Sequence, residues 1–275
     1  MPELPEVETI RQELSPWVVG QSLLRIIILD ARIVADGPAE QICPALIGQR
    51  VESLERRGKY LIFRLSSGKS LIMHLRMTGA LLLNSKESDR YTRAIFDLSG
   101  GDRLLFRDQR RFGLIWLVDD SDTVVGRLGP DPLDDGFTPD VLAEALHQRR
   151  VAVKTALLDQ GVVAGVGNMY ADEALFAAGI HPLRRANDLT AKEVQTLYHC
   201  IRQVLTAAIE GKGASVGTYM RPDGELGRAH FDFKVAHRRG ARCLVCSDRI
   251  ERVAIQNRGT YFCPGCQPPD SERST

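Results

Sequence analysis

The N-terminal stretch Met1-Pro2-Glu3 holds the group in this chain that is best suited to covalent chemistry. If the initiator methionine is removed, as is usual before a small residue, the chain begins with the secondary amine of Pro2. A terminal amine titrates near pH 8 and a lysine near 10.4, so roughly a hundredfold more of the terminal amine is neutral and nucleophilic at pH 7. Its attack on a sugar carbon gives an iminium that cannot lose its charge by N-deprotonation and therefore acts as an electron sink. Glu3 could relay protons beside it.

The same stretch also has the features of an ordinary helix start. Pro5 suits the first helical position, Glu6 complements the positive end of the helix dipole, and Val7 and Ile10 begin an apolar stripe. The two interpretations are compatible, because a helix N-terminus that points at the amine would disfavour its protonation.

Four cysteines form the strongest motif that needs no analogy. Cys243-Leu-Val-Cys246 is followed, after sixteen residues, by Cys263-Pro-Gly-Cys266. Two such pairs let four thiolates surround one Zn²⁺ tetrahedrally, and a site closed by four protein ligands is structural. A redox role for the pairs would need a thioredoxin-like βαβ context, which the sequence lacks.

Two short apolar runs lie between the cysteine pairs, at residues 250–255 and 260–262, and predict a hairpin. The turn around Asn257-Arg258-Gly259 would hold Arg258 outwards, with the metal supplying stiffness that so small a core cannot. An arginine at a hairpin tip is ordinarily only solvated, so the spacing alone gives it no function.

The remaining chain divides into a β-rich half and a helical half. A helix is expected from residue 4 to about 15, ending before Pro16, and the short apolar runs between residues 23 and 117 predict a sandwich or barrel. Residues 119–137, rich in Asp, Gly and Pro, are typical of a linker. Helices are expected at 139–147, 153–158, 169–178 and 190–210, the last with a Thr190/Glu193 capping box, followed by a flexible loop at 211–227.

Composition limits the possible partners. The 275 residues carry a net charge of +1, so any nucleic-acid surface must come from clustered cations. There is no apolar run of 18 residues and no signal-peptide pattern, which predicts a cytoplasmic protein. Cys43 and Cys200 stand alone, and no role follows for them. The basic residues gather in three runs: Arg107, Arg110 and Arg111; Arg149, Arg150 and Lys154; Arg238, Arg239 and Arg242.

The opening Met1-Pro-Glu-Leu-Pro-Glu-Val-Glu-Thr9 resembles that of the bacterial formamidopyrimidine-DNA glycosylases, and the resemblance continues to about residue 267. It implies an α+β fold with an N-terminal β-sandwich domain and helix at 1–130. It also implies a helix–two-turn–helix domain with a lesion-capping loop at 131–227 and a zinc-finger hairpin at 233–267. The implied activity is removal of oxidised purines from duplex DNA, followed by β- and δ-elimination at the abasic site.

The resemblance implies catalytic roles for four residues. Pro2 would be the Schiff-base nucleophile and Glu3 its proton donor. Lys59, in the family-like Arg56-Arg-Gly-Lys-Tyr60, would contact the damaged nucleotide and help proton transfer. Arg258 would grip the phosphates that flank the lesion and assist the second elimination.

The resemblance also implies DNA contacts. The segment 161–168 is similar to the family's helix–two-turn–helix signature, in which Asn168 and backbone N–H groups hold a phosphate. A flipped nucleotide leaves a void that the loops at 74–79 and 109–113 would fill. Tyr91-Thr-Arg93 departs from the His-containing segment usual in the family. The expected contacts are Met77 in the void, Phe112 as wedge, Arg110 on the orphaned base, and Tyr91, Arg149, Lys154 and Asn168 elsewhere on the DNA.

The resemblance to the purine-specific branch, at Leu4 and in the presence of the loop at 211–227, implies oxidised purines as substrate, although the loop sequence is not a close match. The alternatives are a pyrimidine-preferring glycosylase similar to endonuclease VIII and a non-enzymatic zinc-ribbon protein that binds distorted DNA. A tautomerase-like enzyme with a small substrate is a further alternative, but it would need neither the cysteines nor the arginines. The expected partner is duplex DNA with oxidised bases, bound by a monomer at the bacterial nucleoid.

Overall fold

The computed structural model describes residues 1–85 and 89–269. Contacts divide the chain into two compact units. The first contains Met1–Arg127 and Ile209–His230, and the second contains Leu128–Ala208 and the chain from Phe231 on. Within the described ranges, no helix is both long and apolar enough to pass through a membrane.

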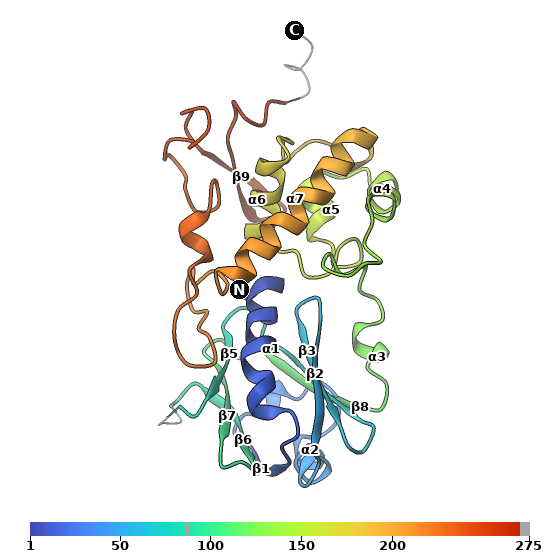
Figure 1. Ribbon diagram of the computed structural model, residues 1–275, viewed down its shortest axis with the longest axis vertical. Coiled ribbons are helices and arrows are strands. Elements are labelled where there is room, and N and C mark those ends of the chain that lie inside the picture. The colour runs from blue at the N-terminus through green and yellow to red at the C-terminus, as the bar shows by residue number, and fades with distance from the viewer. Residues whose placement is uncertain (86–88, 270–275) are drawn as a thin grey trace. The chain divides into compact units, whose positions relative to one another are not determined.

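The first unit is built on two four-stranded antiparallel sheets (Figure 1). Side chains from both sheets share one buried apolar cluster, which is the arrangement of a β-sandwich. One sheet has the order β1-β6-β7-β5, with β1 (Leu23–Ile28), β6 (Thr92–Leu98), β7 (Arg103–Asp108) and β5 (Gly79–Leu83). The other has the order β2-β3-β4-β8, with β2 (Val51–Arg57), β3 (Tyr60–Leu65), β4 (Ser70–His74) and β8 (Leu114–Val118).

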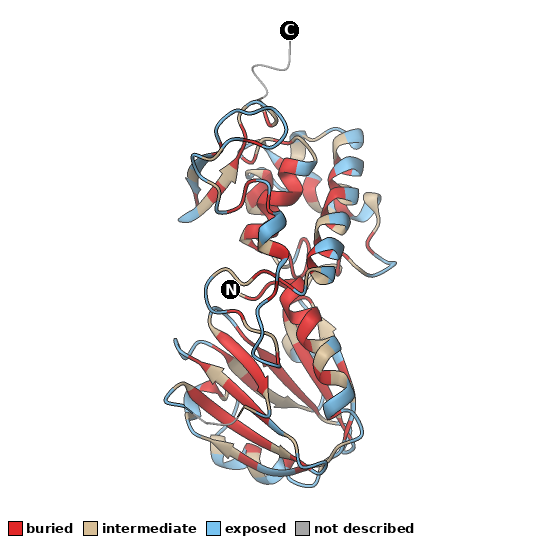
Figure 2. Cartoon of the chain, turned by 60° about the vertical axis from the view of Figure 1, so that its left-hand side comes forward, coloured by how far each residue is buried: buried red, intermediate tan, exposed pale blue. Residues whose placement is uncertain are grey.

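Helix α1 (Leu4–Val18) completes this core. Val7, Ile10, Leu14 and Val18 recur at helical spacing and are at most 1% exposed, and they share one cluster with side chains of both sheets. Figure 2 shows this buried side of the helix in red. Fixed at this point, the N-terminus of α1 carries the first residues of the chain into a buried position.

The prediction that α1 ends before Pro16 was wrong. Pro16 lies inside the last turn, where a proline removes one backbone hydrogen bond. The helix continues because Val18 is buried on the same face as Leu14 and because the Val19 N–H reaches the Ser15 carbonyl at 3.1 Å. Burial of the apolar face therefore outweighs the local proline signal.

The loop after α7 belongs by its contacts to the first unit, whereas the sequence prediction assigned it to the helical domain and described it as flexible. Tyr219 is 3% exposed and lies in the same core cluster as α1. Arg221 forms an ion pair with Glu13 at 2.9 Å, and the Leu83 N–H donates to the Pro222 carbonyl. The shorter elements of this unit are η1 (Ala31–Ile33), α2 (Ala39–Leu46), α3 (Asp122–Val125) and η3 (Ala229–Asp232).

The second unit is helical apart from its final hairpin. The capping box predicted for α7 is confirmed: the Glu193 N–H donates to Thr190 Oγ1, and the Thr190 N–H donates to the Glu193 carboxylate. Buried Glu173 accepts the N–H groups of residues 234–236 and so ties the start of the cysteine module to a helix. The helices are α4 (Pro139–His147), α5 (Val153–Leu158), α6 (Asn168–Ala177), η2 (Ala186–Asp188) and α7 (Ala191–Glu210).

The predicted hairpin forms from β9 (Glu251–Ile255) and β10 (Arg258–Phe262). Its turn is the pair Gln256 and Asn257, whose φ values of 46° and 60° suit a two-residue hairpin turn. Arg258 is therefore the first residue of β10, opposite Ile255, and not a turn residue as the sequence prediction had it. The α+β fold with sandwich, helical region and cysteine hairpin is confirmed.

Candidate active site and DNA-contacting residues

Pro2 and Glu3 are both buried at the start of α1. Glu3 is the N-cap of the helix and forms a capping box with Glu6. One carboxylate oxygen of Glu6 accepts the Glu3 N–H at 2.7 Å, and the other accepts the Ala214 N–H at 2.8 Å. Glu6 thus fixes the backbone beside the predicted nucleophile and joins it to the loop that follows α7.

The glycine before Ala214 is required by this contact. Gly213 has φ +77°, and a Cβ there would lie 3.0 Å from Glu6 Cγ and 2.9 Å from the Tyr219 ring. Burial, with the nearby carboxylates of Glu6 and Glu13, raises the pKa of Tyr219 well above its ordinary value, so its hydroxyl stays neutral. This hydroxyl donates to the Lys212 carbonyl and closes the base of the loop.

Lys59 lies in the two-residue turn between β2 and β3, next to Gly58 with φ 55°, and is 8% exposed. The hairpin is attached to α1 by the ion pair of Arg56 with Glu8 at 2.9 Å. Burial alone would raise the pKa of Glu8, but hydrogen bonds from Arg11 and its other partners lower it. This carboxylate is therefore ionised at neutral pH and holds the Lys59 hairpin on the helix that carries Pro2.

His74 ends β4 close to Lys59. Burial, followed by the charges of Arg76 and Lys59, lowers the pKa of His74 to about 3. Its Nδ1 accepts the Arg76 N–H at 3.0 Å, and its ring meets the edge of Tyr60. The imidazole is therefore neutral and acts here as a hydrogen-bond acceptor.

Met77, Arg110 and Phe112, which the sequence assigned to a void, meet on adjacent turns. Arg110 Nη1 is 3.1 Å from Met77 Sδ, and its Cζ lies 4.7 Å above the Phe112 ring. Met77 is 42% and Phe112 48% exposed, so neither residue is part of a core. An apolar chain, an aromatic ring and a guanidinium at one exposed place match the groups needed to occupy a vacated base-pair position.

Asp108 organises both turns and was not predicted from the sequence. This fully buried carboxylate accepts the N–H groups of Arg110 at 3.1 Å, Phe112 at 2.8 Å and Gly113 at 2.7 Å. Thr78, next to Met77, also donates its hydroxyl to this carboxylate. An Asp that ends a strand and precedes a turn was the only signal in the sequence.

Tyr91 immediately precedes β6 and lies between two cations. The Cζ atoms of Arg90 and Arg107 are 4.7 Å and 5.3 Å from its ring centroid. Arg93, two residues on, is buried and donates to the Asp108 carbonyl at 2.8 Å, which is a structural contact. The segment that departs from the family pattern thus still presents positive charge around a half-buried phenol.

In the second unit, Lys154 and Asn168 both contact Gly259, the residue after Arg258. Lys154 is fully buried and its Nζ lies 2.5 Å from Asp172 Oδ1, whereas the sequence predicted a phosphate contact. Asn168 donates its amide to the Gly259 carbonyl at 2.9 Å. Burial raises the pKa of Asp172, whereas the charge and the hydrogen bond of Lys154 lower it and favour the ionised carboxylate.

Arg149 and Arg258 are both exposed. Arg149 lies after α4 and pairs with Asp159 at 3.1 Å, an ion pair that is exposed on both sides. Such pairs contribute little to stability, so a phosphate can compete for the guanidinium. Arg258 projects from the first position of β10.

The four predicted zinc ligands converge. Their Sγ atoms all lie within 4.8 Å of one another, with Cys243 to Cys266 at 3.8 Å and Cys246 to Cys263 at 3.3 Å. Tetrahedral Zn²⁺ with Zn–S near 2.3 Å requires S–S separations of roughly 3.8 Å, so the donor set fits the ion. Burial and the neighbouring sulfurs raise the pKa of Cys266, so this thiol keeps its proton until a cation replaces it.

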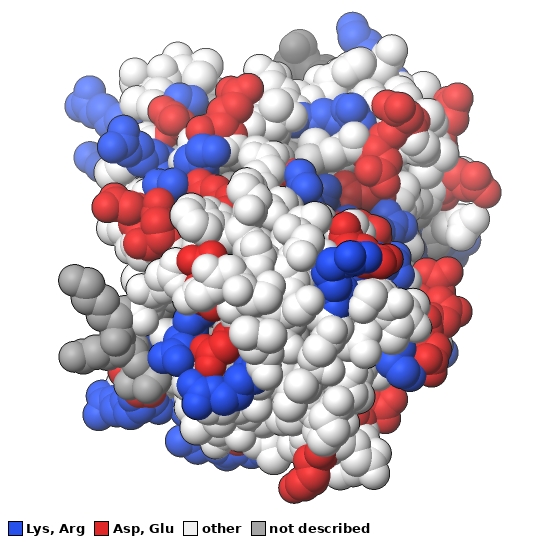
Figure 3. Space-filling view, turned by 60° about the horizontal axis from the view of Figure 1, so that its bottom comes forward, with Lys and Arg blue, Asp and Glu red and all other residues white. Residues whose placement is uncertain are grey.

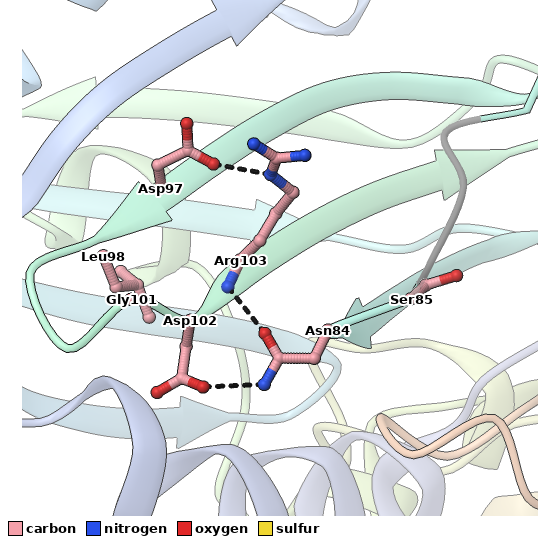
Figure 4. Close-up of a pocket in the computed structure, with 7 residues that line it drawn as sticks. All are labelled: Asn84, Ser85, Asp97, Leu98, Gly101, Asp102 and Arg103. Carbon is pink, nitrogen blue, oxygen red and sulfur yellow. Dashed lines mark hydrogen bonds and ion pairs between the residues drawn. The ribbon is translucent and has the colours of Figure 1, made fainter.

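A pocket of about 330 Å³ beside β6 and β7 holds none of the predicted site residues (Figure 4). Its polar groups satisfy one another: Arg103 bonds Asp97 at 2.6 Å, and Asn84 bonds Asp102 at 2.6 Å. Figure 3 shows a face on which basic and acidic side chains are interspersed. Neither feature provides a convergent reactive group or a uniform basic surface.

The chain matches three family models in succession. Residues 1–115 match the formamidopyrimidine-DNA glycosylase N-terminal domain, 128–219 match the H2TH domain of the same enzymes, and 240–269 match the zinc finger found in FPG and IleRS. The order agrees with the sandwich, the helical region and the cysteine hairpin.

Relatives that align with the chain over nearly their whole length are formamidopyrimidine-DNA glycosylases. The formamidopyrimidine-DNA glycosylase of Symbiobacterium thermophilum is 44% identical, with 98% of this chain and 90% of that protein covered. That of Desulfitobacterium hafniense is 42% identical, with 97% and 100% covered.

Solved structures share the fold. The MutM (Fpg) protein of Thermus thermophilus is 39% identical with a TM-score of 0.89, over 97% of this chain and 98% of that one. The Lactococcus lactis FPG bound to DNA with an abasic site is 33% identical with a TM-score of 0.90, over 97% and 100%. A variant of the Lactococcus lactis protein was solved with Fapy-dG DNA, at 34% identity and a TM-score of 0.90, over 98% and 100%.

Proposed function

Because the chain belongs to the formamidopyrimidine-DNA glycosylase family, we propose that it removes oxidised purines from duplex DNA and then cleaves the strand at the abasic site. The substrates are 8-oxoguanine and formamidopyrimidines, and the protein acts as a monomer on nucleoid DNA. The single observation that carries the proposal is the buried start of α1, where Pro2 precedes Glu3 and the Glu6 carboxylate accepts the Glu3 N–H.

The reaction begins at the Pro2 nitrogen, which attacks C1′ of the flipped nucleotide. The glycosidic bond breaks, the base leaves with the electron pair and a proton, and the sugar ring opens to give an iminium. Glu3 supplies the proton for ring opening, and Lys59 assists transfers near the nucleotide. Loss of the C2′ proton expels the 3′ phosphate, a second elimination expels the 5′ phosphate, and hydrolysis frees the amine.

The remaining residues hold the DNA. Met77, Arg110 and Phe112 occupy the position that the flipped nucleotide leaves, and their mutual contacts support a joint role. Tyr91, Arg149, Asn168 and Arg258 contact phosphates. Zinc, held by Cys243, Cys246, Cys263 and Cys266, stiffens the hairpin that carries Arg258 and takes no part in the reaction.

Borohydride trapping tests the proposal. Incubation with 8-oxoguanine duplex and borohydride should leave protein covalently attached to DNA through Pro2, identified by peptide mapping, whereas undamaged duplex should give no adduct. A form that retains Met1 has no free Pro2 nitrogen and should lose both adduct and strand cleavage. An adduct on a lysine would refute the nucleophile, and lesion binding without any scission would favour a non-enzymatic binder of distorted DNA. Faster excision of oxidised pyrimidines would refute the purine preference.

A further inference from the structure

A buried ion pair between α5 and α6 takes no part in the proposed reaction. Lys154 of α5 and Asp172 of α6 are both 0% exposed, with Nζ 2.5 Å from Oδ1. Removing two ions from water is costly, and the cost is offset only when both groups have well-placed hydrogen-bond partners. The neighbours of the pair indicate its role.

Both members of the pair reach the outer edge of β10, the strand that Arg258 begins. The second oxygen of Asp172 accepts the Tyr261 N–H at 3.1 Å. Lys154 Nζ lies 3.4 Å from the Gly259 carbonyl, which also accepts the Asn168 amide at 2.9 Å. One edge of β10 pairs with β9. At the other edge, which could otherwise pair with a further strand, the backbone groups of Gly259 and Tyr261 bond to side chains of α5 and α6.

The spacing of these contacts sets the register of the hairpin on the helix. Asn168 and Asp172 are four residues apart on α6, which is about 6 Å along a helix axis. Gly259 and Tyr261 are two residues apart on β10, which is about 6.8 Å along an antiparallel strand. The two distances match, so a shift of β10 by one residue would break both contacts.

The metal alone cannot fix Arg258. Arg258 is five residues before Cys263, or about 17 Å along an extended strand, and the turn beyond it consists of exposed residues. Between them, Thr260 and Phe262 are buried, but Arg258 itself is exposed. The groups nearest to Arg258 that hold its backbone from outside the hairpin are those on Gly259 and Tyr261.

We propose that Asp172, which binds Lys154 and the Tyr261 N–H at once, is a positioning residue for Arg258 in the second elimination. This inference rests on the proposed function. Without the negative charge of Asp172, the buried Lys154 ammonium has no counter-ion and the Tyr261 N–H loses a charged acceptor, so the side chains that hold the start of β10 lose their fixed positions. Base removal and the first elimination use the start of α1 in the other unit, so the loss falls mainly on the second elimination.

The test compares wild-type protein with Asp172→Asn on duplex containing an abasic site. Asparagine keeps an oxygen for the Tyr261 N–H but removes the charge. We expect δ-elimination to fall about tenfold relative to β-elimination, with β-elimination within about twofold of wild type. Arg258→Gln should show the same product ratio, and adding Asp172→Asn to it should change the ratio no further.

The double variant Lys154→Gln/Asp172→Asn removes both charges, so no unpaired charge remains buried. It serves as a control for misfolding of the single variant. Zinc content and the thermal unfolding midpoint are measured for every variant. An unchanged ratio of the two products in both variants overturns the proposal. Loss of zinc from the variants, or an equal decline of base removal and both eliminations, would show that Asp172 has only a structural role. Either result would also overturn the proposal. If wild-type protein forms no borohydride adduct and no cleavage product, the proposed function fails instead.

Discussion

Three backbone N–H groups and a hydroxyl converge on Asp108, and this convergence explains how two turns from different strands present one cluster. Burying a carboxylate is costly unless its oxygens accept hydrogen bonds. Asp108 and the two turns therefore stabilise each other's conformation. Gly113, the last of these donors, has no room for a side chain: a Cβ there would lie 2.5 Å from Phe106 Cζ.

Gly113→Ala should therefore destabilise the protein by about 1–3 kcal/mol, because either Phe106 or the turn must move. Gly136→Ala is the matched control, since a Cβ added there would meet no atom within 4 Å, and its effect should stay within roughly 0.5 kcal/mol. Urea unfolding measures the free energy of unfolding of both variants. Equal stability of the two would show that the turn can accommodate a Cβ at residue 113 and would contradict the prediction.

His74 gives a pH dependence with a defined sign. Its pKa is about 3 in the folded protein, so between this value and the ordinary 6.5 the unfolded chain binds a proton that the folded chain does not. Its contribution is fully present above pH 6.5 and is lost as the pH falls towards 3. His74→Gln keeps an acceptor for the Arg76 N–H and removes this titration.

The difference in unfolding free energy between wild type and His74→Gln should therefore change by up to roughly 4 kcal/mol between pH 7 and pH 3 in favour of the variant. Urea unfolding at several pH values measures it. A difference that does not vary with pH would mean that His74 titrates alike in the folded and unfolded chain, which would contradict the lowered pKa.

At the scale of elements, short segments are held by contacts that they cannot supply themselves. The β9–β10 hairpin buries few residues and relies on the four cysteines at one end and on α6 side chains along its edge. The loop after α7 is likewise held by Glu6, by Tyr219 in the core and by the Arg221–Glu13 ion pair. Both segments carry or adjoin proposed site residues.

Removing zinc with a strong chelator should release the cysteine end of the hairpin and abolish binding to lesion-containing duplex, because the contacts from α6 along β10 do not replace the four metal bonds. Fluorescence anisotropy measures binding, and metal analysis should give one zinc per chain before treatment. Restoring zinc is the control for irreversible damage. Undiminished affinity in metal-free protein would contradict the structural role.

At the scale of the whole molecule, the proposed chemistry is divided between two compact units. The first holds the proposed nucleophile Pro2, Lys59 and the cluster of Met77, Arg110 and Phe112, and the second holds Asn168, Arg258 and the four cysteines. Each unit satisfies its own buried carboxylates: Glu6 and Asp108 in the first, Asp172 and Glu173 in the second. The net charge of +1 places no general basic field on the protein, so the DNA contacts must be local.

The sequence by itself determined the features that depend on local spacing. These are the start of α1, the strands, the capping box of α7 and the four-cysteine site, since periodicity and ligand spacing act within a few residues. The tertiary structure alone decided the extension of α1 past Pro16, the place of the loop after α7 and the partners of Glu6, Asp108 and Lys154. Those outcomes depend on burial and on hydrogen bonds between residues up to 208 positions apart, which no local pattern encodes.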